Sequence, residues 1–143
     1  MAKVNPYLIF NGNCEDAFLF YKSVFDTDFS QISKFGDMPP VEGQLLSESD
    51  KNRVMHVSLP IGNDSFLFGS DANSISGDVK MGENISISID ANSKEEADKL
   101  FNGLSNGGVI KMPIAKTFWN AYFGMFEDKF GIHWMVNFDF PTE

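Results

Sequence analysis

The sequence predicts an α+β fold built from two copies of one unit, strand–helix–strand–strand–strand. Three observations support this prediction. An apolar helix face in the first half recurs 80 residues later in the second half, a short strand pattern precedes each helix, and three strand patterns follow it. A four-stranded sheet with one helix buries only one of its faces well, so we expect the two units to share a core.

The first unit begins with the apolar segment Tyr7-Leu8-Ile9-Phe10, which predicts a strand. Asn11-Gly12-Asn13 follows it, and Asn13 stands where the N-cap of a helix belongs. The helix after this cap would place four apolar residues on one face: Ala17, Phe20, Tyr21 and Val24. Three strands are expected next, at Phe29–Phe35, Val54–Leu59 and Phe66–Phe68, with a loop containing Pro39, Pro40 and Gly43 after the first and a turn at Gly62-Asn63-Asp64 before the last.

The second unit repeats this order. Ile85, Ile87 and Ile89 alternate with polar residues, which is typical of a half-buried strand. Ser93-Lys94-Glu95-Glu96 has the pattern of a capping box, and the helix after it would place Ala97, Leu100, Phe101 and Leu104 on one face. Gly107-Gly108 would end this helix. Three strands then follow, at Val109–Met112, Phe118–Phe126 and His133–Phe140, with a turn at Glu127–Gly131 that Asp128 would cap.

The segment between the two units has the composition of a linker. Residues 73–83 contain two glycines and several serines and show no apolar periodicity. We therefore interpret residues 1–143 as a single domain with a first module at 4–72, a linker at 73–83 and a second module at 84–140.

Charge and cysteine content restrict the classes of partner. The formal net charge of −9 repels phosphate backbones and anionic headgroups, so we expect neither nucleic acid nor a membrane as partner. No apolar stretch reaches the roughly 20 residues of a membrane span, and the first residues show no signal-peptide pattern. A single cysteine, Cys14, fits a reducing compartment. Together these features predict a cytoplasmic protein.

Several motifs carry a family resemblance over nearly the whole chain. They are Asn5-Pro6-Tyr7-Leu8, Phe10-Asn11-Gly12-Asn13-Cys14-Glu15-Asp16-Ala17, Phe20-Tyr21-Lys22, His56-Val57-Ser58-Leu59, Gly69-Ser70-Asp71, Thr117-Phe118-Trp119 and Asp128-Lys129-Phe130-Gly131-Ile132-His133-Trp134-Met135. The chain resembles the vicinal oxygen chelate superfamily of glyoxalases, bleomycin-resistance proteins and extradiol dioxygenases, and within it the PhnB-like branch, also labelled as 3-demethylubiquinone methyltransferase-like. Lys129 and Asn120 depart from this branch, which usually has proline and glycine there. The resemblance implies an incomplete, curved mixed β-sheet barrel, glyoxalase-like, with helices outside a concave cleft, and a homodimer.

The resemblance also implies where a metal would bind. Members that do metal chemistry carry His or Glu at four strand positions, which fall here near Pro6, Ser86, Phe68 and Met135. None of these side chains can anchor a divalent cation. The nearest alternatives are His133 and Asp71, so a divergent metal site stays open as an alternative. We expect no metal site of the usual type and no cofactor.

Catalytic groups have weak support in the sequence. An adenosyl cofactor usually sits on a glycine-rich turn between strand and helix, whereas Gly103 and Gly107-Gly108 follow a helix. Cys14 is a candidate nucleophile, because the start of a helix can lower a thiol pKa, or it is simply packed there. His56 is a candidate general base or a hydrogen-bonded core histidine.

The aromatic run Phe118–Phe126 is the most suggestive segment for ligand binding. We expect it to form one wall of the cleft, with Gly124 leaving room for a ligand. The expected ligand-binding residues are Trp119, Tyr122, Phe68, Met135 and Asp71. Three functions follow as hypotheses: binding of a small apolar or aromatic molecule without a conserved metal, an enzyme of the superfamily (lyase, dioxygenase or transferase) that uses His56 or a divergent metal site, and a dimeric interaction protein without ligand.

Overall fold

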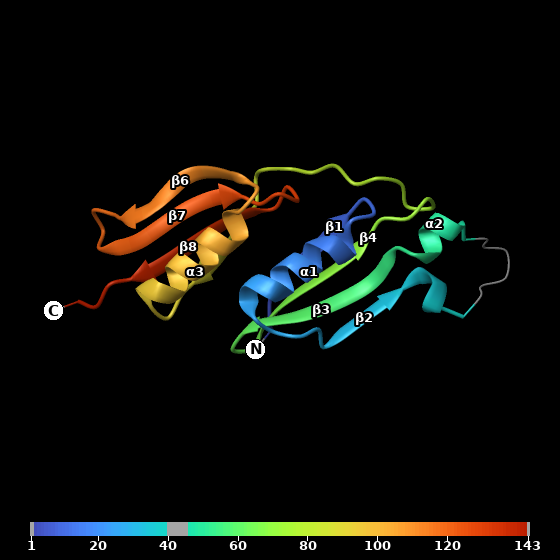
Figure 1. Cartoon of the computed structure of the whole chain (residues 1–143), viewed down its shortest axis with the longest axis horizontal. Coiled ribbons are helices and arrows are strands. Elements are labelled where there is room, and N and C mark those ends of the chain that lie inside the picture. The colour runs from blue at the N-terminus through green and yellow to red at the C-terminus, as the bar shows by residue number, and fades with distance from the viewer. Residues whose placement is uncertain (1, 40–45, 143) are drawn as a thin grey trace. The chain divides into compact units, whose positions relative to one another are not determined.

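A computed structural model describes residues 2–39 and 46–142 of the chain, which divides into two units, Met1–Lys80 and Met81–Glu143 (Figure 1). The predicted positions of Pro40 and Gly43 in a loop lie outside the described residues.

The first unit forms a four-stranded mixed sheet with a helix packed on one face. Its elements are β1 (Tyr7–Phe10), α1 (Cys14–Phe25), β2 (Gln31–Lys34), the 3-10 turn η1 (Phe35–Asp37), α2 (Glu48–Lys51), β3 (Val54–Gly62) and β4 (Ser65–Asp71). The strand order is β1-β4-β3-β2, with β1 parallel to β4 and the other pairs antiparallel. Helix α1 lies across this sheet in Figure 1.

The second unit repeats this topology. Its elements are β5 (Ile87–Asp90), α3 (Lys94–Ser105), β6 (Val109–Lys116), β7 (Ala121–Glu127) and β8 (His133–Asp139). The strand order is β5-β8-β7-β6, again with one parallel pair, β5 with β8. The predicted α+β class with two strand–helix–strand–strand–strand modules is therefore confirmed.

The buried face of α3 is the predicted one, whereas that of α1 is rotated. Ala97, Leu100, Phe101 and Leu104 are all buried on α3. On α1 the buried residues are Cys14, Ala17, Phe18 and Tyr21, so the predicted positions Phe20 and Val24 are wrong and are only half-buried. The helix sequence contains two overlapping apolar faces, one with Phe18 and one with Phe20, and packing against the sheet buries the face with Phe18. Phe18 packs directly on Gly69 of β4, and a Cβ at Gly69 would lie 2.5 Å from its ring.

The two helix starts are satisfied in different ways. Ser93 accepts a hydrogen bond from the Glu96 backbone N–H at 3.0 Å, which confirms the predicted cap of α3. Asn13 occupies the predicted N-cap position of α1, but its side chain makes no cap hydrogen bond. Instead, Asp71 at the end of β4 accepts from the N–H groups of Gly12 and Cys14 at 2.9 and 3.0 Å. A carboxylate from a distant strand therefore replaces the local cap.

Several predicted boundaries in the strands differ from the structure. Helix α2 was not predicted, β3 and β6 run further than predicted, and β2 is shorter. The predicted strand Phe118–Phe126 begins only at Ala121. Residues 117–121 form a turn in which the Thr117 N–H donates to the Ala121 carbonyl at 2.7 Å, and Asn120 has a φ of 65°. Asn120 tolerates this left-handed backbone better than most residues, which explains why the strand breaks there.

The turn before β8 is organised by Asp128, as predicted. Its carboxylate is buried and accepts from the N–H groups of Phe130 and Ile132 at 2.8 and 3.1 Å and from the Trp134 indole N–H at 2.8 Å. This carboxylate fixes the largest fully buried side chain of the molecule, Trp134. Within residues 2–39 and 46–142, every helix is too short or too polar to cross a membrane.

Candidate functional site

An aromatic cluster with one imidazole lies on the face of the first sheet that points away from α1, called here the first distal face. Gly69 and Leu67 of β4 face α1, so Phe68 between them points the other way. The Phe68 ring lies 6.4 Å from the ring of Tyr7 and 5.7 Å from that of His56, centroid to centroid. The Tyr7 hydroxyl approaches His56 Nδ1 at 3.5 Å, the outer limit of a hydrogen bond. The structure therefore brings together two residues that the sequence singles out, Phe68 and His56.

Polar side chains continue this face toward β2. Ser33 on β2 stands opposite His56 in the strand register. The next residue of β2, Lys34, pairs with Val54, so Met55 is an additional residue that forms a β-bulge in β3. Such bulges re-aim side chains and are frequent beside functional sites. The Ser33 hydroxyl oxygen is buried and has no hydrogen-bond partner among the described residues.

The corresponding face of the second sheet, the second distal face, carries two methionines at its centre, with polar residues such as Asn137 and His133 at neighbouring register positions. Gly124 and Phe126 of β7 face α3, so Met125 and Phe123 point away from it. Met125 pairs with Met135 in the strand register. The Trp119 ring lies 6.1 Å from that of Phe123, and its side chain is 54% exposed in the turn before β7. Met135 and Trp119 thus belong to this face. Methionine side chains are flexible, so they can pack against apolar ligands of irregular shape.

Tyr122 lies on the opposite side of the second sheet, toward α3. Its hydroxyl donates to the Asp98 carboxylate at 2.5 Å, and this hydrogen bond raises the pKa of Tyr122, with burial and the Asp98 charge adding to it. The ammonium of Lys94 lies 4.8 Å from the centre of the Tyr122 ring and 3.7 Å from Asp98. These contacts fasten α3 to β7 and separate Tyr122 from Met135 and Trp119.

Asp71 and Cys14 lie together on the α1 side of the first sheet. Besides its bonds to the start of α1, Asp71 accepts from the Val54 N–H at 2.9 Å, and its side chain is buried. Cys14 is 0% exposed. Burial raises the pKa of the Cys14 thiol, and the carboxylates of Asp71 and Glu15 raise it further. This direction is opposite to the lowering that a helix start alone would cause.

We therefore expect Cys14 to be inert in the folded protein. A disulfide reagent that releases a coloured thiolate should modify the native chain at least about a hundredfold more slowly than the urea-unfolded chain, because reaction requires local unfolding. Equal rates in the two states would contradict this expectation and support Cys14 as a nucleophile.

The strand register clarifies the positions at which related folds bind metal. The Phe68 N–H donates to the Pro6 carbonyl at 3.0 Å, so these two positions are neighbours in the first sheet. In the second sheet Met135 pairs with Ser88, two residues beyond Ser86. Proline and phenylalanine offer no side-chain ligand, and serine and methionine are weak ones, so this donor set does not fit a divalent cation. Residues 2–39 and 46–142 contain no group of three His, Cys, Asp or Glu side chains arranged to hold a metal.

The space expected beside Gly124 is filled by the protein itself. A Cβ at this position would lie 2.6 Å from the Phe101 ring of α3 and 2.9 Å from the Ile114 Cα of β6. Gly124 therefore makes room for the helix and not for a ligand, and the sequence interpretation of this glycine is wrong. The reason is that Gly124 faces α3, whose Phe101 ring lies against it.

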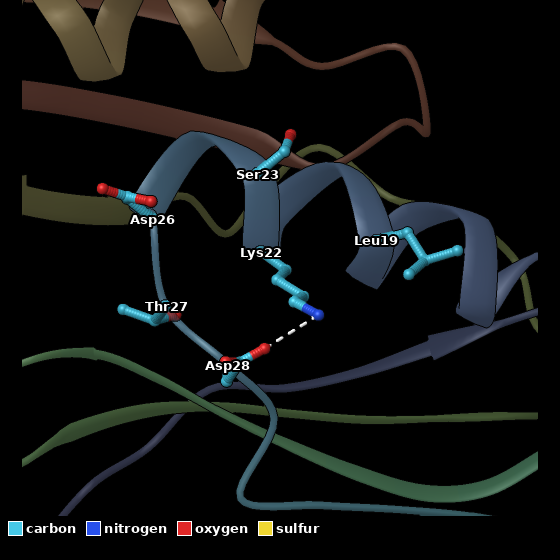
Figure 2. A pocket seen from close by; sticks show the side chains of 6 residues that line it. All are labelled: Leu19, Lys22, Ser23, Asp26, Thr27 and Asp28. Carbon is cyan, nitrogen blue, oxygen red and sulfur yellow. Dashed lines mark ion pairs between the residues drawn. The ribbon is translucent and has the colours of Figure 1, made fainter.

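A surface hollow of about 630 Å³ lies at the end of α1 (Figure 2). Its lining is Leu19, Lys22, Ser23, Asp26, Thr27 and Asp28. Lys22 and Asp28 form an ion pair of 2.8 Å across it, with Asp28 almost fully solvated. Because Lys22 and Asp28 pair with each other and every lining residue except Leu19 is polar, this hollow lacks the apolar walls of a ligand pocket.

Sequence reasoning missed two residues of the first distal face. The sequence places Tyr7 in a strand and in the first family motif, and Ser33 in an alternating segment, without marking either as a site residue. The pairing of Tyr7 with Phe68 and of Ser33 with His56 places them beside the predicted residues. Alternation along each segment already separates the two faces, but only the register shows which residues stand opposite one another.

Comparisons with known proteins agree on one family. The family model described as 3-demethylubiquinone-9 3-methyltransferase matches residues 2–137. Protein YjdN of Escherichia coli (strain K12) is 28% identical over 94% of this chain and 93% of its own length. The crystal structure of PA1353 from Pseudomonas aeruginosa is 40% identical, covers 97% of this chain and 98% of its own, and has a TM-score of 0.81. A PhnB protein from Bacillus cereus, a putative 3-demethylubiquinone-9 3-methyltransferase, is 25% identical with a TM-score of 0.74 over 96% of this chain and 99% of its own.

A more distant likeness identifies the fold alone. A glyoxylase/bleomycin resistance protein/dioxygenase domain from Frankia sp. EAN1pec has a TM-score of 0.68 at 12% identity, over 98% of this chain and 99% of its own. The glyoxalase-like fold expected from the sequence motifs is thereby confirmed.

Proposed function

Because the chain belongs to the 3-demethylubiquinone-9 3-methyltransferase family, PhnB-like proteins with the glyoxalase-type fold, we propose that it binds a small aromatic molecule without a conserved divalent metal. The binding surface in this proposal is the first distal face, with Phe68 at its centre.

The supporting observation is the cluster of Tyr7, Phe68 and His56. Phe68 stands near a position where the family resemblance implies a metal ligand, and here the rings of Tyr7, His56 and Phe66 contact it. Tilted ring pairs at these distances attract one another and offer the same attraction to a third planar ring. Tyr7 is 48% exposed, so the cluster is open to a ligand from at least one side.

Methyl transfer, which the family description names, has no fitting site in the described residues. A nucleotide-like cofactor would use the N–H groups at the turn between β1 and α1. The N–H groups of Gly12 and Cys14 already donate to Asp71, so they are not free to bind a cofactor.

Titration with a neutral aromatic probe tests the proposal. We expect 2-naphthol to bind with a dissociation constant of about 10–100 μM, because a ligand with so few non-hydrogen atoms gains limited binding free energy at a partly open apolar site. Phe68→Ala should weaken binding about tenfold, because it removes most of the ring contact area. Isothermal titration calorimetry measures both, and addition of a chelator should leave the affinity unchanged.

Two matched variants locate the site. Phe138→Ala removes a ring of the second sheet that contacts Phe140 and should leave binding unchanged. Trp119→Ala tests the second distal face: a loss as large as that of Phe68→Ala would extend the site to this face. Absence of saturable binding, or its loss on chelation, would contradict the proposal.

A second candidate is a metal-free enzyme in which His56 is the general base. The contact between the Tyr7 hydroxyl and Nδ1 favours it, because an oriented imidazole is better suited to proton transfer than a mobile one. Mass spectrometry of a bound compound after incubation with the native chain and with His56→Phe would separate conversion from binding. The homodimer implied by the resemblance stays a prediction.

A further inference from the structure

We infer that the aromatic ligand carries a neutral hydroxyl group, as a phenol does, and that His56 and Ser33 hydrogen-bond to it. This inference rests on the proposed binding of an aromatic molecule and names its chemical class.

The first argument is the number of polar atoms left over at the cluster. His56 uses Nδ1 toward Tyr7, and within the described part of the chain its other ring nitrogen, Nε2, has no hydrogen-bond partner. The Ser33 hydroxyl oxygen, opposite His56 in the register, is buried and has no partner there either. Opposite residues of an antiparallel pair have their Cβ atoms only about 4.5–5.5 Å apart. A buried polar atom without a partner costs folding free energy, so the Ser33 hydroxyl, across from an imidazole nitrogen that is free to hydrogen-bond, indicates a polar group that binds there.

The second argument is the match of a hydroxyl to these two groups. Nδ1 of His56 either accepts from the Tyr7 hydroxyl or donates to it, and Nε2 has the opposite role in the neutral ring. A serine hydroxyl both donates and accepts. A ligand hydroxyl, itself donor and acceptor, satisfies either arrangement, whereas a carbonyl oxygen satisfies only one.

The third argument is charge. The chain carries a net charge of −9, yet the first distal face holds no Asp, Glu, Lys or Arg in its register positions. These positions are Tyr7, Ile9, Gln31, Ser33, His56, Ser58, Pro60, Phe66, Phe68 and Ser70. A charged ligand would lose hydration here without gaining a partner of opposite charge. A neutral ligand avoids this cost.

Three probes that differ in one substituent test the inference: naphthalene, 2-naphthol and 2-naphthoate, titrated into the full chain at neutral pH. We expect 2-naphthol to bind about tenfold more tightly than naphthalene and the carboxylate more weakly than both. His56→Phe keeps an aromatic ring in place. It should weaken the binding of 2-naphthol but not that of naphthalene, so that the two affinities differ by no more than about twofold. Ser33→Ala should reduce it partially.

The other histidine supplies the matched control. His133→Phe makes the same substitution in the second module and should leave all three affinities unchanged, and circular dichroism confirms that each variant is folded. Equal affinities for naphthalene and naphthol, or a naphthol preference that survives His56→Phe, would overturn this inference while the proposed aromatic site stands. Tightest binding of the carboxylate would also overturn it. Absence of binding by both neutral probes would overturn the proposed function and this inference with it.

Discussion

Replacement of Asp71 by alanine is expected to lower the free energy of unfolding by about 3 kcal/mol or more. The Asp71 carboxylate accepts three backbone hydrogen bonds, from Gly12, Cys14 and Val54, at 2.9 to 3.0 Å. Its side chain is buried, so water does not take its place in the variant. The variant leaves the buried N–H groups of Cys14 and Val54 without their acceptor, at a cost of about 1–3 kcal/mol each, and it also removes the part-buried hydrogen bond from Gly12.

Urea denaturation followed by circular dichroism measures this change. Asp78→Ala, at an exposed position, removes the same charge and should change the free energy of unfolding by less than about 0.5 kcal/mol. If Asp71→Ala is as stable as Asp78→Ala, the carboxylate does not hold β4, α1 and β3 together. An Asp71 that was mainly a ligand-binding residue would show that pattern, with binding lost and stability retained.

Gly124→Ala is expected to destabilise the chain by about 1–3 kcal/mol, because its Cβ would overlap the core. The nearest atoms would be the Phe101 ring at 2.6 Å and the Ile114 Cα at 2.9 Å, and the latter belongs to the backbone of β6 and moves only with its strand. The binding of 2-naphthol at the first distal face should be unchanged in the fraction of chains that is folded.

Gly62→Ala is the control for this substitution. A Cβ at Gly62 would have no atom within 4 Å, and its backbone is not in the left-handed region, so no destabilisation is expected. Thermal unfolding of the two variants compares them directly. Equal melting temperatures would mean that Gly124 borders open space, and the earlier interpretation of this glycine as room for a ligand would return.

The sequence was sufficient for the features that depend on local periodicity. The apolar face of α3 and the cap at Ser93 occur where the pattern predicts them, because a short apolar spacing and a capping serine act within one turn of helix. The same holds for the Asp128 turn, whose hydrogen bonds span at most six residues.

The sequence failed where a distant residue decides a local feature. Asn13 has the chemistry of a cap, but Asp71 from β4 takes its place. Phe20 fits a helix face as well as Phe18 does, and Gly69 of the sheet selects Phe18. Phe118 and Trp119 continue the aromatic run, yet the positive φ of Asn120 turns the chain before β7 begins.

The candidate site shows the same division. The sequence by itself determined that the chain has two similar modules, it placed Phe68 and Met135 near the positions where the family resemblance implies metal ligands, and it singled out His56 as a candidate. Only the tertiary structure decided that Tyr7, His56 and Phe68 share one face with Ser33, and that Tyr122, Asp71 and Gly124 face the helices. The physical reason is that alternation fixes two faces along a strand, whereas the face that meets the helix, and the partners across the sheet, are fixed by packing between segments far apart in the chain.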